Sequence, residues 1–430
     1  MTRIFMGTVC MTVLLSLSAP AWAEDTASEL QSLKAEIAKM QERINQLEQA
    51  QQQAAVAASA APVSGAQSND NAFNPAISAV LNGHFSAFSN KNPTVAGFGT
   101  GDDGKHGSQG LSLDESELGI SSNVDDKFAA QITASLSEAG ASVEEAYVKS
   151  LGLPGGLGFK AGRFLQPVGY LNEHHGHTDD FADRPLPSRI FLNNEYKDDG
   201  VGMSWILPTN TYAEIGGSAL RGDDFPAGNV DQAHSGAWAA YSKIGGDIGA
   251  NQNWLLGFST LQASPSLRKG NDDTVKFIGD SDLYLASVRY IWDPTGNSLE
   301  KELTLQGEYF WRKEDGTYED TGAVTGAVPF NGGQTGWYAQ GVYKFLPQWR
   351  VGARYSQLNP DNVPAGLVAS ALDAHEHNPW NAALMTDWTN SEFSRVRLQY
   401  GHENPAAGKQ DDQIILQYIM AIGAHPAHTF

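Results

Sequence analysis

The residues best suited to chemistry stand together in one stretch, LNEHHGHTDDFADRP, which runs from residue 171 to residue 185. Its histidines and acids are Glu173, His174, His175, His177, Asp179, Asp180 and Asp183. Neutral imidazole and carboxylate groups together suit a divalent transition metal such as Zn²⁺ or Cu²⁺. The alternative interpretation is a polar surface loop in which histidine is merely tolerated. The choice between them depends on the elements that hold this stretch.

The spacing of the histidines limits any metal site that they form. His174 and His175 point apart if the backbone is extended, so only two of the three rings converge easily. A site therefore needs a turn at Gly176, and Asp179, Asp180 or water must complete the coordination. Such a site would be weak and exchangeable, which suits capture and release of an ion.

The first 23 residues are typical of a secretory signal peptide. Arg3 precedes a short apolar run, and AWA at residues 21–23 is a small-x-small cleavage site. The single cysteine, Cys10, lies within this signal, so the mature chain has no disulfide framework. We expect the mature protein to begin at Glu24, outside the cytoplasm.

Charge and composition narrow the class of protein. A formal net charge of −21 argues against nucleic acid or an anionic membrane face as partner, since both require a basic surface. The chain is rich in aromatic residues and glycine, yet its mean hydropathy is −0.34. Membrane-spanning strands give this combination because every second residue faces water. Composition alone also allows a large secreted β-protein.

The residues after the signal peptide form two further segments. Residues 24–50 carry apolar residues spaced alternately three and four apart, which predicts a short coiled coil. Its seam is Leu30, Leu33, Ile37, Met40, Ile44 and Leu47. Residues 51–75 are rich in Gln, Ala and Ser and are interpreted as a linker.

From residue 76 to residue 430 the hydrophobic pattern has a period of two, which predicts β-strands. In WRVGARYS, residues 349–356, the aromatic and aliphatic side chains alternate with Arg350 and Arg354. In RVRLQY, residues 395–400, they alternate with Arg395 and Arg397. Arginines along one face of a strand require a water-filled interior or dense pairing, so a dry sandwich core is disfavoured.

About sixteen such strands are predicted, an even number that suits a closed antiparallel barrel. They lie near residues 79–88, 113–122, 127–136, 142–150, 157–164, 200–207, 211–220, 236–244, 253–262, 283–292, 302–312, 335–345, 349–357, 380–388, 393–401 and 412–422. Their connections alternate between tight turns and long loops, the latter at 89–112, 165–199, 263–282, 313–334 and 358–379. Alternating short and long connections are the signature of an outer-membrane barrel.

This organisation resembles the outer-membrane porins of Gram-negative bacteria that carry an N-terminal coiled coil. The stretch VEEAYVKSLGLPGGLGFKAGRFLQPVGYLN, residues 143–172, is similar to the corresponding region of phosphate-selective porins O and P. The resemblance implies an all-β transmembrane barrel, a homotrimer, a periplasmic coil and a third outer loop folded into the pore. Phosphate selectivity is not carried over, because that family uses a ladder of Arg and Lys and this chain is acidic.

The function predicted on this basis is passive diffusion of small hydrophilic solutes or ions across the outer membrane. Acids of the third loop, Glu173, Asp179, Asp180 and Asp183, would face wall arginines Arg350, Arg354, Arg395 and Arg397. Opposite charges across a constriction create a transverse field that favours small polar solutes. The alternative is capture and uptake of Zn²⁺ or Cu²⁺ by the loop histidines. No nucleophile–base arrangement indicates an enzyme, and no cofactor other than such a metal is expected.

Overall fold

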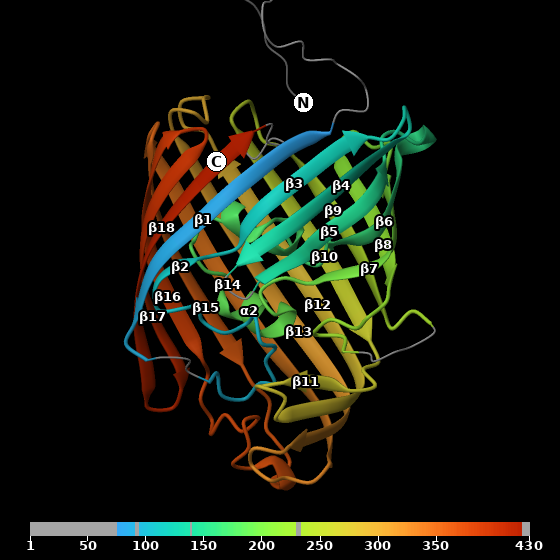
Figure 1. Cartoon of the computed structure of the whole chain (residues 1–430), viewed down its shortest axis with the longest axis vertical. Helices are drawn as coiled ribbons and strands as arrows, with labels where there is room; N and C mark the ends of the chain where they lie inside the picture. Colours follow the sequence, from blue (N-terminus) through green and yellow to red (C-terminus); the bar gives the residue numbers. More distant parts are fainter. Residues whose placement is uncertain (1–74, 91–93, 138–139, 229–233, 424–430) are drawn as a thin grey trace, which may run out of the picture. The chain divides into compact units, whose positions relative to one another are not determined.

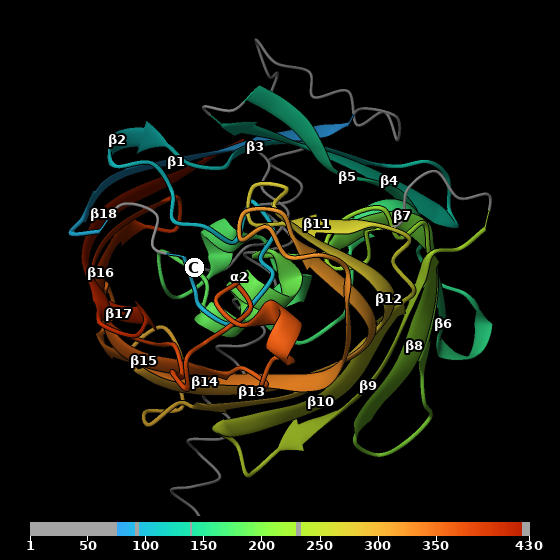
Figure 2. The same ribbon diagram turned by 90° about the horizontal axis from the view of Figure 1, so that it is seen from below.

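The computed structural model describes residues 75–90, 94–137, 140–228 and 234–423. The predicted signal peptide, the coiled-coil seam from Leu30 to Leu47 and residues 51–74 of the predicted linker lie outside these residues. The described part of the chain forms one sheet that closes on itself, because the last strand pairs antiparallel with the first (Figures 1 and 2).

Adjacent strands of the barrel wall pair antiparallel. Their bounds are β1 (Ala76–Phe88), β2 (Gly110–Leu113), β3 (Ser116–Asn123), β4 (Phe128–Ser137), β5 (Gly140–Ser150), β6 (Leu157–Leu165), β7 (Lys197–Ile206), β8 (Tyr212–Leu220), β9 (Ala237–Asp247), β10 (Gln252–Ala263), β11 (Arg268–Gly270), β12 (Val275–Trp292), β13 (Glu302–Asp320), β14 (Val328–Leu346), β15 (Trp349–Asn359), β16 (Trp380–Ser391), β17 (Ser394–Ala406) and β18 (Lys409–Gly423). Strands β2 and β3 both pair with β1 and form one interrupted wall strand, and β11 extends β12 as a short hairpin. The described wall therefore has sixteen strands, which confirms the predicted closed antiparallel barrel.

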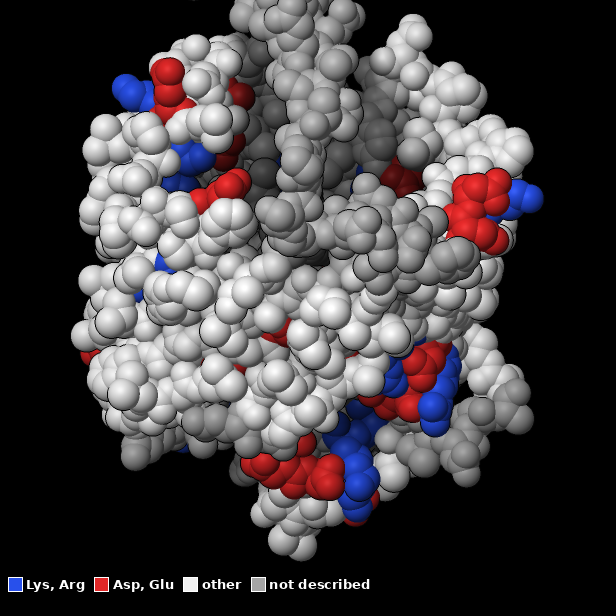
Figure 3. All heavy atoms as spheres, turned by 45° about the horizontal axis from the view of Figure 1, so that its top comes forward, with Lys and Arg blue, Asp and Glu red and all other residues white. Residues whose placement is uncertain are grey.

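Side chains alternate between an apolar outer face and a polar inner face. On β18, Leu416 is 46% exposed and the next residue, Gln417, is 2% exposed. On β17, Leu398 is 49% exposed whereas Arg397 is buried inside the barrel. Figure 3 shows the same division, because uncharged residues cover most of the visible side wall and charged residues gather toward the two ends. An apolar exterior of this kind requires a nonpolar solvent such as lipid.

The connections differ in two places from those predicted. Residues 263–282 were expected to be a loop, but they contain β11 and the first residues of β12, which begins at Val275. Residues 313–334 were expected to be a loop, but β13 and β14 extend through them and leave only residues 321–327 between the strands. The stretch KEDGTYED has no apolar face to reveal it as a strand. A strand that projects beyond a barrel can be polar on both faces, so the period-two pattern fails there. Among the described residues, no helix has the length and apolar character needed to cross a membrane.

Short helices occur only in the connections of the described chain. They are η1 (Pro154–Gly156), η2 (Leu171–Glu173), η3 (Gly176–Thr178), α2 (Leu186–Leu192) and η4 (Ala365–Leu367). Three of them, η2, η3 and α2, belong to the connection between β6 and β7, which contains the histidine-rich stretch.

Candidate functional site inside the barrel

The connection between β6 and β7, residues 166–196, folds into the barrel and is called the interior loop below. Figure 2 shows its helix α2 within the ring of strands. The loop leaves and re-enters the wall at one place, because Leu165 and Lys197 are paired neighbours in the β6–β7 ladder. The sequence placed the histidine-rich stretch in this connection, and the structure confirms that position.

An apolar contact anchors the interior loop to one side of the barrel. Helix α2 lies against β13, β14 and β15, and its Phe191 is completely buried. The Phe191 ring stacks on Phe310 of β13 at 5.8 Å and meets the edge of Phe98 at the same centroid distance. Asn193 ends the helix in the left-handed conformation, with φ of 55°, and its backbone N–H donates to the Ser188 carbonyl. Burial of this hydrophobic face fixes the loop against the wall.

Ion pairs and hydrogen bonds hold the interior loop to the wall strands β15 and β17. Arg350 binds Asp180 of the loop at 2.8 Å and Asp387 of β16 at 2.5 Å. Arg354 binds the Asp183 carboxylate at 2.7 Å, and Arg397 donates to the Asp179 carbonyl at 2.7 Å. These contacts join the loop and the wall directly, so the charges do not face each other across an open space.

This arrangement differs from the expected transverse field. The predicted inward orientation of Arg350, Arg354, Arg395 and Arg397 is observed, since all four lie on the inner face of the wall. Asp387, which the sequence analysis did not single out, lies among three of these arginines and is completely buried as a side chain. A buried charge is tolerated when it is paired, which explains why arginines and carboxylates alternate here.

The remaining acids of the stretch are also paired. Asp179 accepts a hydrogen bond from Arg184 at 2.8 Å, within the same loop, and Glu173 forms an ion pair with Lys243 of β9. Burial raises the pKa of Asp179 to about 6, against the opposing charge of Arg184. Asp179 and Asp180 are therefore engaged with arginines and do not join the histidines as the metal-site hypothesis required.

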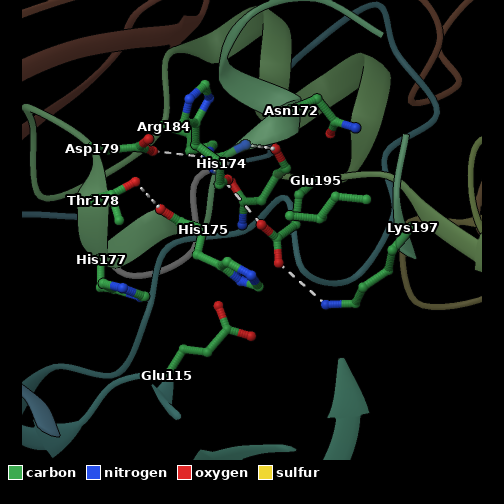
Figure 4. A network of polar contacts seen from close by, with 12 residues as sticks. Glu115, Asn172, His174, His175, His177, Thr178, Asp179, Arg184, Glu195 and Lys197 are labelled. Carbon is green, nitrogen blue, oxygen red and sulfur yellow. Dashed lines mark hydrogen bonds and ion pairs between the residues drawn. The ribbon is translucent and has the colours of Figure 1, made fainter. Parts of the chain in front are cut away.

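The three histidines separate into one ring and a pair. The His174 ring packs on Tyr170, with its Nδ1 at 2.9 Å from the Tyr170 carbonyl, and lies on the opposite side of the loop from the other two (Figure 4). Burial and the nearby charge of Arg184 lower the pKa of His174 to about 4. His175 and His177 stack at 5.8 Å, and η3 begins at Gly176 between them. The chain therefore turns at Gly176, and the rings of His175 and His177 lie together. Metal binding by the three histidines stays a prediction.

The His175–His177 pair meets glutamates of the wall. His175 Nε2 is 3.1 Å from Glu145 of β5, and His177 Nδ1 is 2.7 Å from Glu117 of β3. Burial alone would lower the pKa of His175, but the hydrogen bond to Glu145 and the charges of Glu117 and Glu145 raise it to about 9. The carboxylate partners of the histidines thus come from the barrel wall, not from their own loop.

Sequence analysis missed Glu144 and Glu145 of β5 because of a local irregularity. In a regular strand Glu144 and Glu145 would point to opposite faces, so at most one would reach the interior. The β4–β5 ladder shifts register next to Thr133, which pairs with Glu145 while Ala134 pairs with Val143. This bulge turns both glutamates inward, and both are buried. The sequence did offer one signal of these inward glutamates, namely two adjacent carboxylates, Glu144 and Glu145, within a predicted membrane strand.

Three larger cavities and one small space border the interior loop. One of the three, of about 520 Å³, lies by Arg189 and Ile190 of helix α2, and the other two border the histidines. A cavity of about 580 Å³ is bordered by β1, residues 102–107 and the loop, and one of about 450 Å³ is bordered by β5–β9 and the loop. A space of about 30 Å³ lies by Glu117, His175 and His177. His177 also borders the cavity of about 580 Å³ and His175 that of about 450 Å³. The histidine–glutamate cluster therefore lies between these two cavities.

Comparison with solved structures identifies the fold. The outer-membrane channel DcaP of Acinetobacter baumannii superposes with a TM-score of 0.52 at 13% identity, over 81% of this chain and 97% of that chain. The trimer form of OmpT, an outer-membrane protein of Vibrio cholerae, gives a TM-score of 0.51 at 12% identity, over 81% and 99%. The chain has the sixteen-stranded barrel fold of the outer-membrane porins.

Sequence comparison adds a closer relative. An uncharacterized protein of Aquifex aeolicus (strain VF5) is 30% identical over 344 residues, covering 75% of this chain and 70% of that protein. The chain belongs to the same family as this Aquifex protein. No protein-family model matches the chain. Membership of the phosphate-selective O and P subfamily remains a prediction from the sequence alone.

Proposed function

We propose that this protein is a porin-like channel of the outer membrane through which small hydrophilic solutes or ions diffuse passively. The observation that carries the proposal is a closed barrel, apolar outside and polar inside, with a loop docked in its interior beside polar cavities. Passive channels need a wall that lipid can solvate and an interior that water can solvate. The barrel fold shared with outer-membrane proteins supports the proposed location.

The interior loop acts in this proposal as the constriction of the channel. Its apolar anchor occupies the β13–β15 side of the barrel, so solutes pass on the opposite side, where the cavities lie. The test is swelling of liposomes that contain the purified chain, measured with sugars of increasing size. We expect rapid swelling with small sugars and a steep loss of rate as the sugar grows. Swelling no faster than that of protein-free liposomes would contradict the proposal.

The charges around the larger cavity favour cations. Its carboxylates outnumber its lysines and arginines, the carboxylates being Asp102, Asp103, Asp114, Glu115, Asp179, Asp183 and Glu195. The basic residues there are Lys105, Arg184, Arg189 and Lys197. An excess of carboxylate raises the local cation concentration at low salt, because the opposite charges are screened only over a Debye length.

We therefore expect a moderate preference for K⁺ over Cl⁻ when reversal potentials are measured in a KCl gradient. Asp102→Asn combined with Asp114→Asn removes two accessible charges of the cavity and should reduce the preference. Asp273→Asn is a matched control, because Asp273 is an exposed carboxylate that does not border this cavity. An anion preference in the wild type, abolished by Arg350→Ala, would show that the wall arginines govern selectivity instead.

We further propose that the channel is a homotrimer held partly by the predicted coil. The seam from Leu30 to Leu47 supports it, since a lone helix of that length is marginally stable in water. The trimer form of the Vibrio cholerae protein with the same fold also supports it. Removing residues 24–60 should convert trimers to monomers in detergent, as measured by light scattering, whereas removing only residues 51–60 should not. A deletion protein that still elutes as a trimer would exclude this role of the coil.

A further inference from the structure

The histidine–glutamate cluster beneath η3 has the geometry of a metal site, with wall ligands that the sequence alone did not suggest. We propose that His175, Glu117 and Glu144 bind one divalent transition-metal ion of the Zn²⁺ type between the interior loop and strands β3 and β5. The inference goes beyond the channel function, because metal binding to the purified chain can fail while conductance stands, and the reverse holds too.

Three potential ligand atoms converge from separate elements. His175 Nδ1 is 3.4 Å from Glu117 Oε1 and 3.8 Å from Glu144 Oε2, and all three atoms lie within 4.8 Å of one another. Ligands about 2.0–2.2 Å from a tetrahedral Zn²⁺ ion are separated from one another by about 3.4 Å. The atoms are thus too far apart for strong hydrogen bonds and close to the spacing that one ion imposes.

Two of these atoms have unused bonding capacity in a buried place. Glu144 is 0% exposed and His175 is 8% exposed, yet Glu144 Oε2 and His175 Nδ1 have no hydrogen-bond partner. A buried polar atom without a partner destabilises the fold, and more so when it is charged. The two atoms are 3.8 Å apart, so a single cation between them would satisfy both.

Each proposed ligand is oriented by a hydrogen bond to a further residue, as metal ligands in proteins usually are. In the neutral His175 ring the proton lies on Nε2, because the contacting carboxylate of Glu145 can only accept, and the Nδ1 lone pair is then available to a metal. His177 Nδ1 contacts Glu117 at 2.7 Å, and Lys197 donates to the other oxygen of Glu144 at 2.8 Å. All three proposed ligands are therefore held in position.

Charge and space at the cluster favour a dication that keeps an exchangeable position. The carboxylates there are Glu115, Glu117, Glu144, Glu145 and Glu195, and the nearby basic residues are Lys160, Lys197 and Arg184. The excess of negative charge is buried, so a bound dication would relieve it. The space of about 30 Å³ beside Glu117 and His175 has room for water as a fourth ligand. An imidazole ligand favours Zn²⁺ or Co²⁺ over Ca²⁺ or Mg²⁺.

The test is calorimetric titration of Zn²⁺ into the full chain, purified in detergent and stripped of metal with a chelator. We expect one Zn²⁺ per chain, with affinity reduced at least roughly 10-fold in His175→Ala and Glu117→Gln. His174→Ala is the matched control, since it removes the neighbouring imidazole that faces away. Its isotherm should match that of the wild type. Co²⁺ should give the visible absorption of a low-coordinate site in the wild type and in His174→Ala only.

Other outcomes would overturn the inference. Equal Zn²⁺ isotherms for the wild type and His175→Ala, or no binding by the wild type, would show that His175 is a protonated ring paired with glutamates. Binding of Ca²⁺ with the same affinity as Zn²⁺ would identify a nonspecific acidic cluster. Glu145→Gln, which retains the shape of the side chain, gives a second test if His175→Ala fails to fold. Heat-modifiable migration on a gel reports folding of each variant, and Glu145→Gln should also weaken Zn²⁺ binding.

Discussion

The single-channel conductance should rise severalfold when the interior loop is removed, because the loop occupies the barrel beside the proposed route of solutes. Leu165 and Lys197 are already paired neighbours at the ends of β6 and β7. Residues 166–196 can therefore be replaced by a short Asn-Gly turn of the kind that joins antiparallel strands. The measurement is the conductance of the purified variant in planar bilayers, compared with the wild type in the same KCl solution.

A matched replacement distinguishes the interior loop from loops in general. The same Asn-Gly turn in place of residues 322–326 shortens the connection between β13 and β14, which lies outside the loop–wall contact. We expect that variant to retain the wild-type conductance. If both replacements left the conductance unchanged, the interior loop would not limit the flow of ions, and the proposed constriction would be wrong.

The second large effect is expected from Asp183→Ala, which removes one charged tether between the interior loop and the wall. Asp183 accepts hydrogen bonds from Arg354 of β15 at 2.7 Å and from Gln399 of β17 at 2.5 Å. Arg354 is buried and lies over the Phe181 ring at 4.7 Å. Removing one partner of a buried ion pair costs about 3–5 kcal/mol, because the remaining charge is left uncompensated. The loop should therefore detach often, giving frequent steps to a wider conductance state.

A double-mutant cycle isolates the pair. The double variant Asp183→Ala/Arg354→Met leaves no unpaired buried charge. We therefore expect fewer steps to the wider conductance state than in Asp183→Ala alone. Asp102→Ala is the control for loss of an exposed carboxylate, since the Asp102 side chain is 70% exposed and its pair with Lys105 contributes only about 0.2–1 kcal/mol. Equal behaviour of Asp183→Ala and Asp102→Ala would mean that the buried pair does not hold the loop.

The barrel was predictable because its pattern is repeated in every wall strand. A lipid-facing residue such as Leu398 must be apolar and an inward one such as Arg397 must be polar, so alternation reveals each strand separately. The pattern failed at residues 313–320, where β13 continues with polar residues on both faces. The alternating pattern also could not show the interruption between β2 and β3. The register against β1 shifts by one residue there, and such a bulge changes which residues face inward without changing the composition.

The candidate site was predictable only in part. The sequence placed His175 and His177 in the right connection and indicated that only two of the three rings would converge, without showing which two. Their partners come from strands distant in sequence, and the decisive inward turn of Glu144 depends on a register shift against β4. Likewise, the wall arginines were expected to face the loop acids across a gap, but apolar docking of Phe191 brings the loop into direct contact with that wall. Such contacts depend on packing in three dimensions, which a one-dimensional pattern does not contain.

The central claim, that this barrel is an open channel, is tested most directly by adding the purified full-length protein to a planar lipid bilayer in KCl. We predict discrete, reproducible current steps whose size grows linearly with voltage and with salt concentration. Protein that folds into the bilayer, as shown by heat-modifiable migration, but gives no steps above those of protein-free lipid would contradict the claim.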